Sequence, residues 1–406
     1  MIEASDRAGQ GIAYSTTEPA HLLNVPADGM SAWAGDPDHF ARVFESEGGD
    51  RSGFAQRRMF GRYLRSMLDE AVASGNTEVR QATAVAATRE GHTWEVGFND
   101  GSSINVAALV LATGNQEPLS LAAFAGAAER LIANPWGAEA RAAVQDLAVS
   151  GESALLVGTS LTMVDLVLSL DAAGHNGRIV ALSRRGQVPR GHAGYEPVSV
   201  RADEVPVGSV RELTRWLRRR GAEIGWRAAI DSLRPHSHPL WQSLGTEQQR
   251  RFLRHARPWW DVHRHRIAPE VAATVARLIA DGRLEIVAGR IVRARELAGA
   301  LEVHYRRRGA AQPQTERFAY AFNCTGPLHS MTHSKDPLLR SLLDSSEVRP
   351  DQIGVGVEVD GTCRAGEHLW AMGPLTKGRY WEIIAVPDIR DQAAAIADDI
   401  QRELGE

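Results

Sequence analysis

The sequence predicts an α/β protein with two Rossmann-like, three-layer domains, one inserted in the other, and an added helical lobe. Three observations support this fold class. A buried strand, a glycine turn, a helix and a second strand follow one another between Ser153 and Ser183. Apolar strands at residues 107–112 and 318–323 each run into a Thr-Gly turn. The stretch from about 210 to 279 is helical in pattern and rich in Arg and Trp, which predicts the lobe.

Bulk composition excludes several classes of protein. A length of 406 residues favours two domains, because single cores stop growing near ~250–300 residues. The net charge of -4 gives no reason to expect nucleic-acid or membrane binding. Two distant cysteines exclude a disulfide framework and a cysteine-rich metal site. No apolar run could span a bilayer and no signal peptide is visible, so we expect a cytoplasmic protein.

The strand at Ser153–Gly158, the helix after Ser160 and the strand at Arg178–Ser183 form one βαβ unit. A dinucleotide pyrophosphate needs such a strand, a tight glycine turn and a helix N-terminus. Compared with the usual G-x-G-x-x-G/A pattern, Ser160 and Met163 replace the second and third small residues, so a plain strand–turn–helix stays open as an alternative. The predicted pyrophosphate-binding residues are Gly158, Thr159, Ser160, Leu161 and Thr162.

Arg184 and Arg185 follow the second strand, where an acidic residue would select NAD. Arginine accommodates a 2′-phosphate there, so the sequence predicts NADPH. The alternative is that the two arginines merely solvate a strand end.

The opening residues Met1–Ala4 are typical of the end of a second strand in another dinucleotide unit, where Glu3 would bind an adenosine ribose. Gly9 and Gly11 follow in a loop that could run past a cofactor. The first strand and glycine loop of this unit, roughly thirty residues, are missing. We expect a start codon placed too late rather than a truncated copy.

Eight segments resemble the FAD/NAD(P)-binding protein family, which is related to flavin-containing and N-hydroxylating monooxygenases. They are GIAYSTTEPAHLLNVPADGMSAW (11–33), RRMFGRYL (57–64), LVLATGN (109–115), LLVGTSLTMVD (155–165), ALSRRG (181–186), RPWWDVHRHR (257–266), NCTGP (323–327) and GPLTKGRYWEIIAVPDIR (373–390). They cover nearly the whole chain in the family's order.

The resemblance implies an FAD-binding domain at 1–150 and 321–406, and an NADPH-binding domain at 151–320 with a helical insertion at about 210–280. It implies that the run His21–Pro26, including Leu23 and Val25, lies along the FAD. Thr113 and Gly114 would close over the flavin phosphates. The other implied FAD contacts are Gly373, Pro374 and Leu375 beside the ring, and Glu382 and Ile383, with Trp381, on a helix that caps it.

The segment Gly373–Ala385 supports this role from its residues alone. A strand at 369–372, a Gly-Pro-Leu turn with exposed amides and a helix start would place a helix N-terminus where it stabilises negative charge. An ordinary strand–loop–helix is the alternative. Residues 388–403 predict a structural amphipathic helix.

The run Arg257–Arg266 combines arginines, histidines and tryptophans, as a nucleic-acid surface would. Packing of a helical lobe, with arginines facing a cofactor or anionic substrate, is the better interpretation. His263 and His265 lie on different helix faces, so we predict no metal site. Cys324 has no C-x-x-C partner, which argues against dithiol chemistry.

We therefore expect a flavin-dependent oxidoreductase that uses NADPH to reduce FAD and acts on a small molecule, with a monooxygenase as its specific form. His21 and Asn24 are the candidate catalytic residues, for orienting an oxygen adduct. A non-catalytic NAD(P)H-binding or partner-binding protein that has lost its flavin is one alternative. An oxidoreductase that inserts no oxygen is another.

Overall fold

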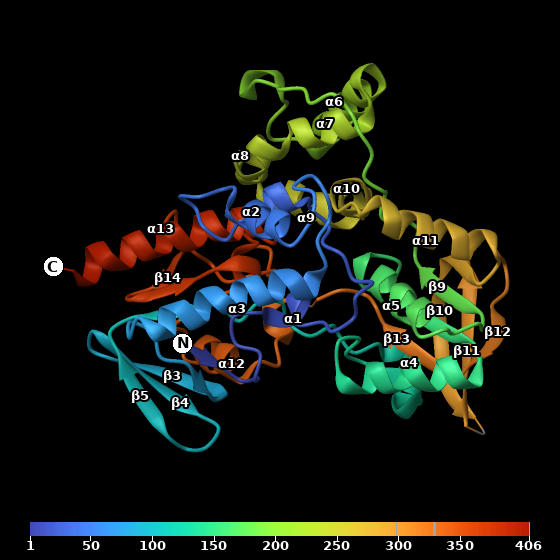
Figure 1. The fold of residues 1–406 in the computed structure, drawn as a ribbon, viewed down its shortest axis with the longest axis horizontal. Coiled ribbons are helices and arrows are strands. Elements are labelled where there is room, and N and C mark those ends of the chain that lie inside the picture. Colours follow the sequence, from blue (N-terminus) through green and yellow to red (C-terminus); the bar gives the residue numbers. More distant parts are fainter. Residues whose placement is uncertain (298, 328–329, 406) are drawn as a thin grey trace.

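The computed structural model describes residues 1–297, 299–327 and 330–405 (Figure 1). Its largest sheet has seven strands, in the order β12-β11-β10-β9-β8-β13-β7. Strands β7 to β10 and β13 pair in parallel, and β11 and β12 extend the sheet in antiparallel fashion. The bounds are β7 (Leu131–Ile132), β8 (Ala154–Val157), β9 (Ile179–Ser183), β10 (Leu284–Leu297), β11 (Ala300–Arg307), β12 (Gln314–Phe318) and β13 (Tyr320–Asn323).

One face of this sheet is covered by three helices, α4 (Ala138–Ser150), α5 (Leu161–Ala172) and α11 (Pro269–Ala280). Their apolar side chains and those of β8, β9 and β13 form one buried cluster. Strand β8 is buried at every position, as a central parallel strand between two layers must be. The predicted βαβ unit is therefore confirmed as β8-α5-β9.

The remaining strands form three small sheets. Strand β1 (Ile2–Glu3) pairs in parallel with β2 (Arg80–Gln81), and β6 (Leu109–Leu111) with β15 (Leu369–Ala371), which also pairs with β14 (Arg364–Gly366). Strands β3 (Ala84–Glu90), β4 (Thr93–Phe98) and β5 (Ser103–Val106) form an antiparallel meander. The turn between β4 and β5 lies at Asn99-Asp100-Gly101, where Gly101 has φ of 82°.

Five helices belong to the part of the chain that contains the three small sheets. They are α1 (Gly11–Tyr14), α2 (His39–Ser46), α3 (Arg57–Ala73), α12 (Pro337–Asp344) and α13 (Val386–Leu404). Single 3-10 turns lie at Ala27–Gly29, Ala122–Phe124, Ala128–Arg130, Ala202–Glu204, Arg234–His236, Met331–His333 and Gly373–Thr376. The fold class predicted from the sequence is confirmed. The domain bounds stay a prediction, and the seven-stranded sheet draws strands from both sides of 151–320.

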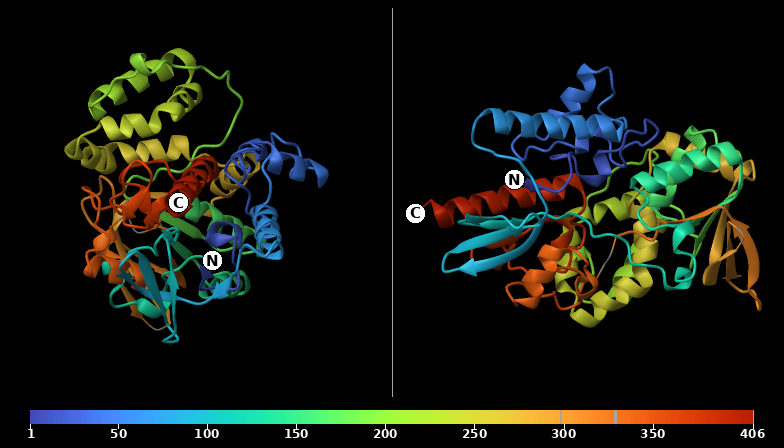
Figure 2. Two further views of the ribbon diagram at one scale, coloured as in Figure 1. Left: turned by 90° about the vertical axis from the view of Figure 1, so that its left-hand side faces the viewer. Right: turned by 90° about the horizontal axis from the view of Figure 1, so that it is seen from below.

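The helical lobe stands apart from both sheet regions, at the top of Figure 1, and Figure 2 shows it on one side of the molecule. It contains α6 (Val210–Ile224), α7 (Trp226–Ser232), α8 (Ser237–Ser243), α9 (Thr246–Arg251), a π-helical turn (Phe252–Ala256) and α10 (Arg257–Arg264). This confirms the predicted helical character. Within the described residues, no helix combines the length and apolarity that crossing a membrane requires.

A buried ion pair joins the N-terminal segment to the seven-stranded domain. Arg57, the first residue of α3, donates from Nη1 to Asp165 Oδ2 of α5 at 2.8 Å, and both side chains are over nine-tenths buried. Arg57 Nε also donates to the carbonyl oxygen of Leu22 at 2.9 Å. His21 contacts the Asp165 carbonyl oxygen through Nε2 at 3.0 Å. The segment before α3 is thereby held against α5.

We predict that Arg57→Met destabilises the protein by about 3–5 kcal/mol, because it leaves the Asp165 carboxylate buried without its partner. The double variant Arg57→Met/Asp165→Leu should recover much of this loss, since no charge then stays buried. Denaturant unfolding measures both effects. Arg62→Met is the matched control on the same helix, because its pair with Glu47 is exposed, and it should change stability by less than about 1 kcal/mol.

Candidate functional site

Two glycine turns from distant parts of the chain meet at one sheet edge. Strands β6 and β15 are parallel, with Leu111 opposite Ala371, so the turns that follow them lie side by side. Gly114 and Gly373 both have left-handed backbones, with φ of 69° and 61°. No atom of residues 1–297, 299–327 and 330–405 lies within 4 Å of where a Cβ would stand at either glycine, so these residues leave open space in front of both turns. Residues of both turns line one small cavity.

Lys377 borders the same cavity and is over nine-tenths buried. Its Nζ lies 3.5 Å from Asn115 Oδ1. Burial, together with the nearby charge of Arg257, lowers the pKa of Lys377 to about 8. The chain has only two lysines among 46 basic Lys and Arg residues. This buried cation beside two open glycine turns is a site residue that the sequence reasoning missed.

The turn at Gly373 is held by α13 from behind. Gln392 Oε1 accepts from the Gly373 backbone amide at 2.6 Å, and Gln392 Nε2 donates to Thr376 Oγ1 at 2.9 Å. The prediction that all the amides of this turn are exposed is therefore wrong for Gly373, whose N–H is buried against Gln392. The turn is a single 3-10 segment, and α13 begins only at Val386.

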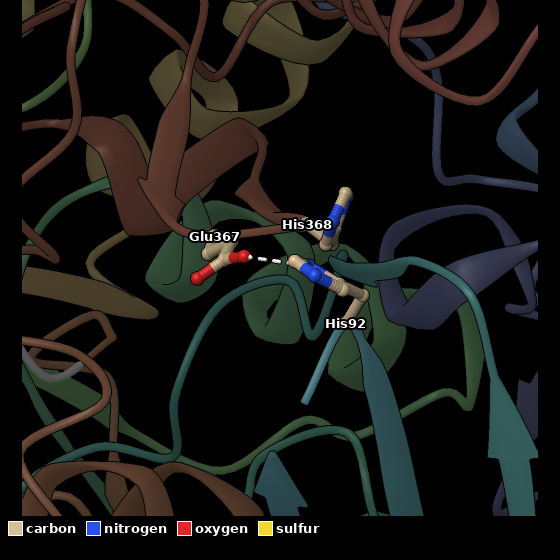
Figure 3. A group of neighbouring side chains, drawn as sticks. All are labelled: His92, Glu367 and His368. Carbon is tan, nitrogen blue, oxygen red and sulfur yellow. Dashed lines mark hydrogen bonds and ion pairs between the residues drawn. The ribbon is translucent and has the colours of Figure 1, made fainter. Parts of the chain in front are cut away.

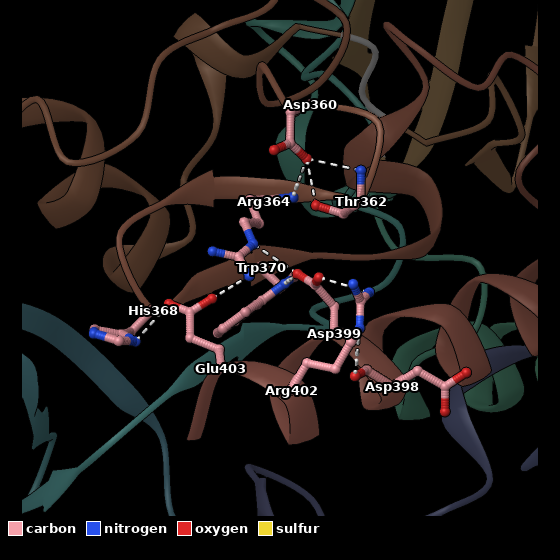
Figure 4. A network of polar contacts seen from close by, with 9 residues as sticks. All are labelled: Asp360, Thr362, Arg364, His368, Trp370, Asp398, Asp399, Arg402 and Glu403. Carbon is pink, nitrogen blue, oxygen red and sulfur yellow. Dashed lines mark hydrogen bonds and ion pairs between the residues drawn. The ribbon is translucent and has the colours of Figure 1, made fainter. Parts of the chain in front are cut away.

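The far end of α13 is fixed to the β14–β15 hairpin by a polar network (Figure 4). Asp399 accepts from Arg364 Nε at 2.6 Å and from Trp370 Nε1 at 3.0 Å. His368 Nδ1 lies 2.8 Å from Glu403. Because β15 leads into the Gly373 turn, this network sets the position of Gln392 relative to that turn.

Trp381, Glu382 and Ile383 do not lie on a helix, so that prediction is wrong: they occupy turns before α13. Glu382 is buried, and its carboxylate accepts from Trp260 Nε1 at 2.8 Å and pairs with Arg264 at 3.3 Å. Burial would raise the pKa of Glu382, but His265, Arg264 and Trp260 together lower it to about 2. Glu382 therefore joins the helical lobe to residues 373–385, which we call the closing segment.

Arginines of the run 257–266 are paired within the protein, and the interpretation that they face a cofactor or anionic substrate stays a prediction. Arg264 pairs with Glu382, Arg266 with Asp231 at 2.5 Å, and Arg257 with Asp261 at 3.2 Å. Of the two tryptophans in the run, Trp260 packs in the lobe as expected, whereas Trp259 is exposed. Cys324 is fully buried, and burial raises the pKa of its thiol, which suits a packing role.

The N-terminal candidates are spread along one edge of the fold. Glu3 ends β1, and its Oε1 accepts from the Ser5 amide at 3.0 Å. Gly9 and Gly11 have φ of 82° and 64°, so both turns use the left-handed region that glycine favours. These three residues stay predicted cofactor contacts.

His21 and Asn24 differ in what their side chains contact. Both ring nitrogens of His21 are engaged, Nδ1 with Thr16 at 2.9 Å and Nε2 with α5 at 3.0 Å. The Asn24 carbonyl oxygen contacts His192 Nε2 at 2.9 Å, and its half-buried carboxamide has no hydrogen bond to the described residues. Leu23 is buried and Val25 is half-buried. Asn24 thus has a free polar group, whereas His21 ties two elements together.

The glycine turn after β8 has the geometry of an anion site. Gly158 has φ of 120°, and a Cβ there would lie 2.2 Å from the Cys324 carbonyl oxygen, so only glycine fits. Ser160 caps α5 without a side-chain hydrogen bond, which leaves the first amides of the helix without a capping side chain. The Thr159 hydroxyl lies 2.8 Å from Ser183 Oγ, which joins the turn to the end of β9. Leu161 and Thr162 form the first turn of α5.

Arg184 and Arg185 follow β9, which lies beside β8 in the sheet. Arg184 is exposed and makes no ion pair with the described residues. Arg185 is half-buried and donates to the Arg254 carbonyl oxygen at 3.5 Å. Arg184 is therefore the freer of the two for a phosphate.

His92, Glu367 and His368 place ligand-type atoms within 4.8 Å of one another (Figure 3). Glu367 already pairs with Arg89 and, at 3.0 Å, with His92. The cluster is largely exposed and joins the tips of two hairpins. We therefore interpret this cluster as a structural contact between the two hairpins.

Comparison with known proteins finds a family model that matches the N-terminal part of the chain. Residues 1–116 match the FAD-NAD(P)-binding family model. The resemblance predicted from the sequence is confirmed over that segment. A search of curated proteins finds no match.

Solved structures share the fold over almost the whole chain. L-lysine 6-monooxygenase from Pseudomonas syringae is 15% identical with a TM-score of 0.67, covering 99% of this chain and 90% of that one. An Erwinia amylovora cadaverine monooxygenase bound to FAD is 12% identical with a TM-score of 0.65, covering 98% and 86%. Ornithine N-hydroxylase from Kutzneria sp. 744, with reduced FAD, NADP⁺ and L-ornithine, is 15% identical with a TM-score of 0.63, covering 99% and 91%. At such identities the matches establish the fold.

We predict that Lys377→Met stabilises the protein at pH 7 by on the order of 3 kcal/mol, because a buried cation is removed. The folded-state pKa near 8 lies below the unfolded value of 10.5, so the unfolded chain binds more protons between these pH values. Wild-type stability should therefore rise relative to Lys377→Met as pH increases from 8 to 10.5. Denaturant unfolding at pH 7 and pH 10 tests this.

Lys335→Met is the matched control, since this other lysine is exposed. It should leave the pH dependence unchanged. Equal pH dependence in wild type and Lys377→Met would contradict the lowered pKa.

Proposed function

We propose that this protein is an oxidoreductase that binds FAD and NADPH and uses NADPH to reduce the flavin. The observation that carries the proposal is the pairing of two open glycine turns, after β6 and β15, in a chain that also presents a glycine turn and a free helix N-terminus after β8. The family match over residues 1–116 and the fold shared with flavin-dependent hydroxylases support it.

The residues present suit FAD. Gly114 and Gly373 leave room for a group to approach the backbone, and Thr113 is exposed beside them. Lys377 offers a buried positive charge that would stabilise an anionic ring or phosphate. Glu3, Gly9, Gly11, Leu23 and Val25 complete the proposed contacts on the N-terminal side, with Pro374, Leu375 and Ile383 on the closing segment.

The residues present also suit NADPH. The unpartnered amides at the start of α5 and its dipole would hold the pyrophosphate. Arg184, which is exposed and has no ion pair among the residues that the structure describes, would hold the 2′-phosphate.

Bound FAD supplies the redox chemistry, by accepting a hydride from NADPH and passing electrons to an acceptor. The protein positions the two cofactors by the contacts of Arg57 and His21 with α5, which join the segment along FAD to the helix at NADPH. Asn24 would orient a reacting oxygen through its free carboxamide. His21 would act by positioning, since its ring nitrogens are already bonded. We propose that the protein is a monooxygenase that acts on a small molecule. We place it in the cytoplasm, where cysteines such as the two free, buried ones of this chain stay reduced.

The direct test is the visible absorption spectrum of the purified protein. We expect oxidised-flavin bands that bleach when NADPH is added without oxygen. If NADPH is consumed steadily with a substrate when oxygen is absent, the protein is an oxidoreductase that does not insert oxygen into its substrate. A colourless protein that still binds NADPH would overturn the proposal in favour of a non-catalytic NADPH-binding protein.

We predict that Arg184→Gln weakens NADPH binding about tenfold or more and leaves NADH binding within about twofold, because the lost charge-assisted bond involves only the 2′-phosphate. Cofactor titration followed by tryptophan fluorescence measures both. Arg219→Gln, an exposed arginine on α6, controls for the change in net charge. An equal loss for both nucleotides would contradict the role of Arg184.

A further inference from the structure

The helical lobe contains a cavity of about 890 Å³. Residues of α6, α7, α8, α9, the π-helical turn and α10 line it, and Trp381 and Glu382 of the closing segment form part of its wall. Ligand sites in proteins typically enclose ~300–1,000 Å³, so this one has room for a bulky molecule.

Tryptophan is concentrated in the cavity wall. Five of the ten tryptophans in the chain line it, Trp226, Trp241, Trp259, Trp260 and Trp381. Trp241 stacks on Trp381 with ring centroids 5.0 Å apart, and Phe252 meets Trp381 edge-on at 5.5 Å. Such walls favour a ligand with a large apolar or aromatic body.

Positive charge borders the same cavity. Arg211, Arg215 and Arg218 lie at i, i+4 and i+7 on α6, so they share one face of the helix. All three are exposed, line the cavity and make no ion pair with the described residues. Like charges at this spacing repel, which a bound anion would relieve.

Negative charge is scarce by comparison. Among the described residues that line the cavity, Glu382 alone is acidic. Its carboxylate is already taken up by Trp260, Arg264 and His265. The cavity therefore offers apolar walls and an unneutralised basic border.

We propose that this cavity binds a small molecule with a bulky aromatic or hydrocarbon body and one anionic group, a carboxylate or sulfonate. The body lies among the tryptophans, and the anion contacts the arginines of α6. The similar structures are named for action on lysine or cadaverine, or hold L-ornithine, and all three molecules carry cationic amines. The three arginines disfavour such amines here.

Trp381 and Glu382 follow closely the Gly373–Lys377 turn at which we place the flavin. The ligand is therefore the substrate class of the oxidoreductase, an assignment that rests on the proposed function. The binding site itself rests only on the cavity and its charges.

The test uses two fluorescent probes with similar aromatic bodies. One is the anion 8-anilinonaphthalene-1-sulfonate, and the other is neutral N-phenyl-1-naphthylamine. Energy transfer from tryptophan reports binding in the cavity, because half of the tryptophans line it. Three proteins are compared with wild type: R211Q/R215Q/R218Q, the cavity-filling Thr214→Trp, and R58Q/R219Q/R308Q, which removes the same charge from exposed positions outside the cavity.

We expect R211Q/R215Q/R218Q to weaken binding of the anion about tenfold or more and of the neutral probe less than about twofold. Thr214→Trp should weaken both, and R58Q/R219Q/R308Q neither. Naphthalene-2-carboxylate should displace the anion, and cadaverine should not. Equal anion binding by wild type and R211Q/R215Q/R218Q would overturn the anion preference. Unchanged binding of both probes to folded Thr214→Trp would overturn the site.

These outcomes are separable from the proposed function. Probe binding of the expected pattern in a protein that holds no flavin would keep the ligand site and remove its assignment as substrate site. A flavin that is reduced by NADPH, in a protein whose cavity variants bind the probes as wild type does, would keep the proposed function and remove this inference.

Discussion

The contact on which the arrangement of the site depends is the buried pair of Arg57 and Asp165. Two charges removed from water are tolerated only when they meet each other and their remaining hydrogen-bonding groups are satisfied. Here Arg57 also binds the Leu22 carbonyl oxygen, and His21 contacts the Asp165 backbone. The pair therefore specifies one position of the N-terminal segment on α5. Helix α5 also begins at the glycine turn after β8. The positions of both proposed cofactor sites therefore depend on this one helix.

A second buried carboxylate, that of Glu382, fixes the position of the helical lobe. Trp260 and Arg264 lie on α10 and His265 follows it, whereas Glu382 comes from the closing segment more than a hundred residues later. Because this contact joins the lobe to the segment that follows the Gly373 turn, Trp381 and Glu382 form part of the cavity wall.

Much of the site could be anticipated because its elements are local. The glycine at 158, the strand before it and the helix after it are neighbours in sequence, so period and turn chemistry were enough. The same holds for the helices after residue 210. Lys377 was missed although it is one of two lysines, because rarity alone does not reveal burial. The helix expected at 381–383 is a turn, since the chain there bends to bring Glu382 to α10.

The sequence by itself determined the fold class, the positions of the glycine turns and the arginines after β9, all of which follow from patterns within about thirty residues. Only the tertiary structure decided which groups are free. It placed His21 in hydrogen bonds to Thr16 and α5, whereas the Asn24 carboxamide has none within the described part of the chain. It paired Arg264 and Arg266, whereas Arg211, Arg215 and Arg218 make no ion pair with any described residue. The reason is physical: a charged or polar side chain takes its role from partners brought together by packing, and those partners lie far away along the chain.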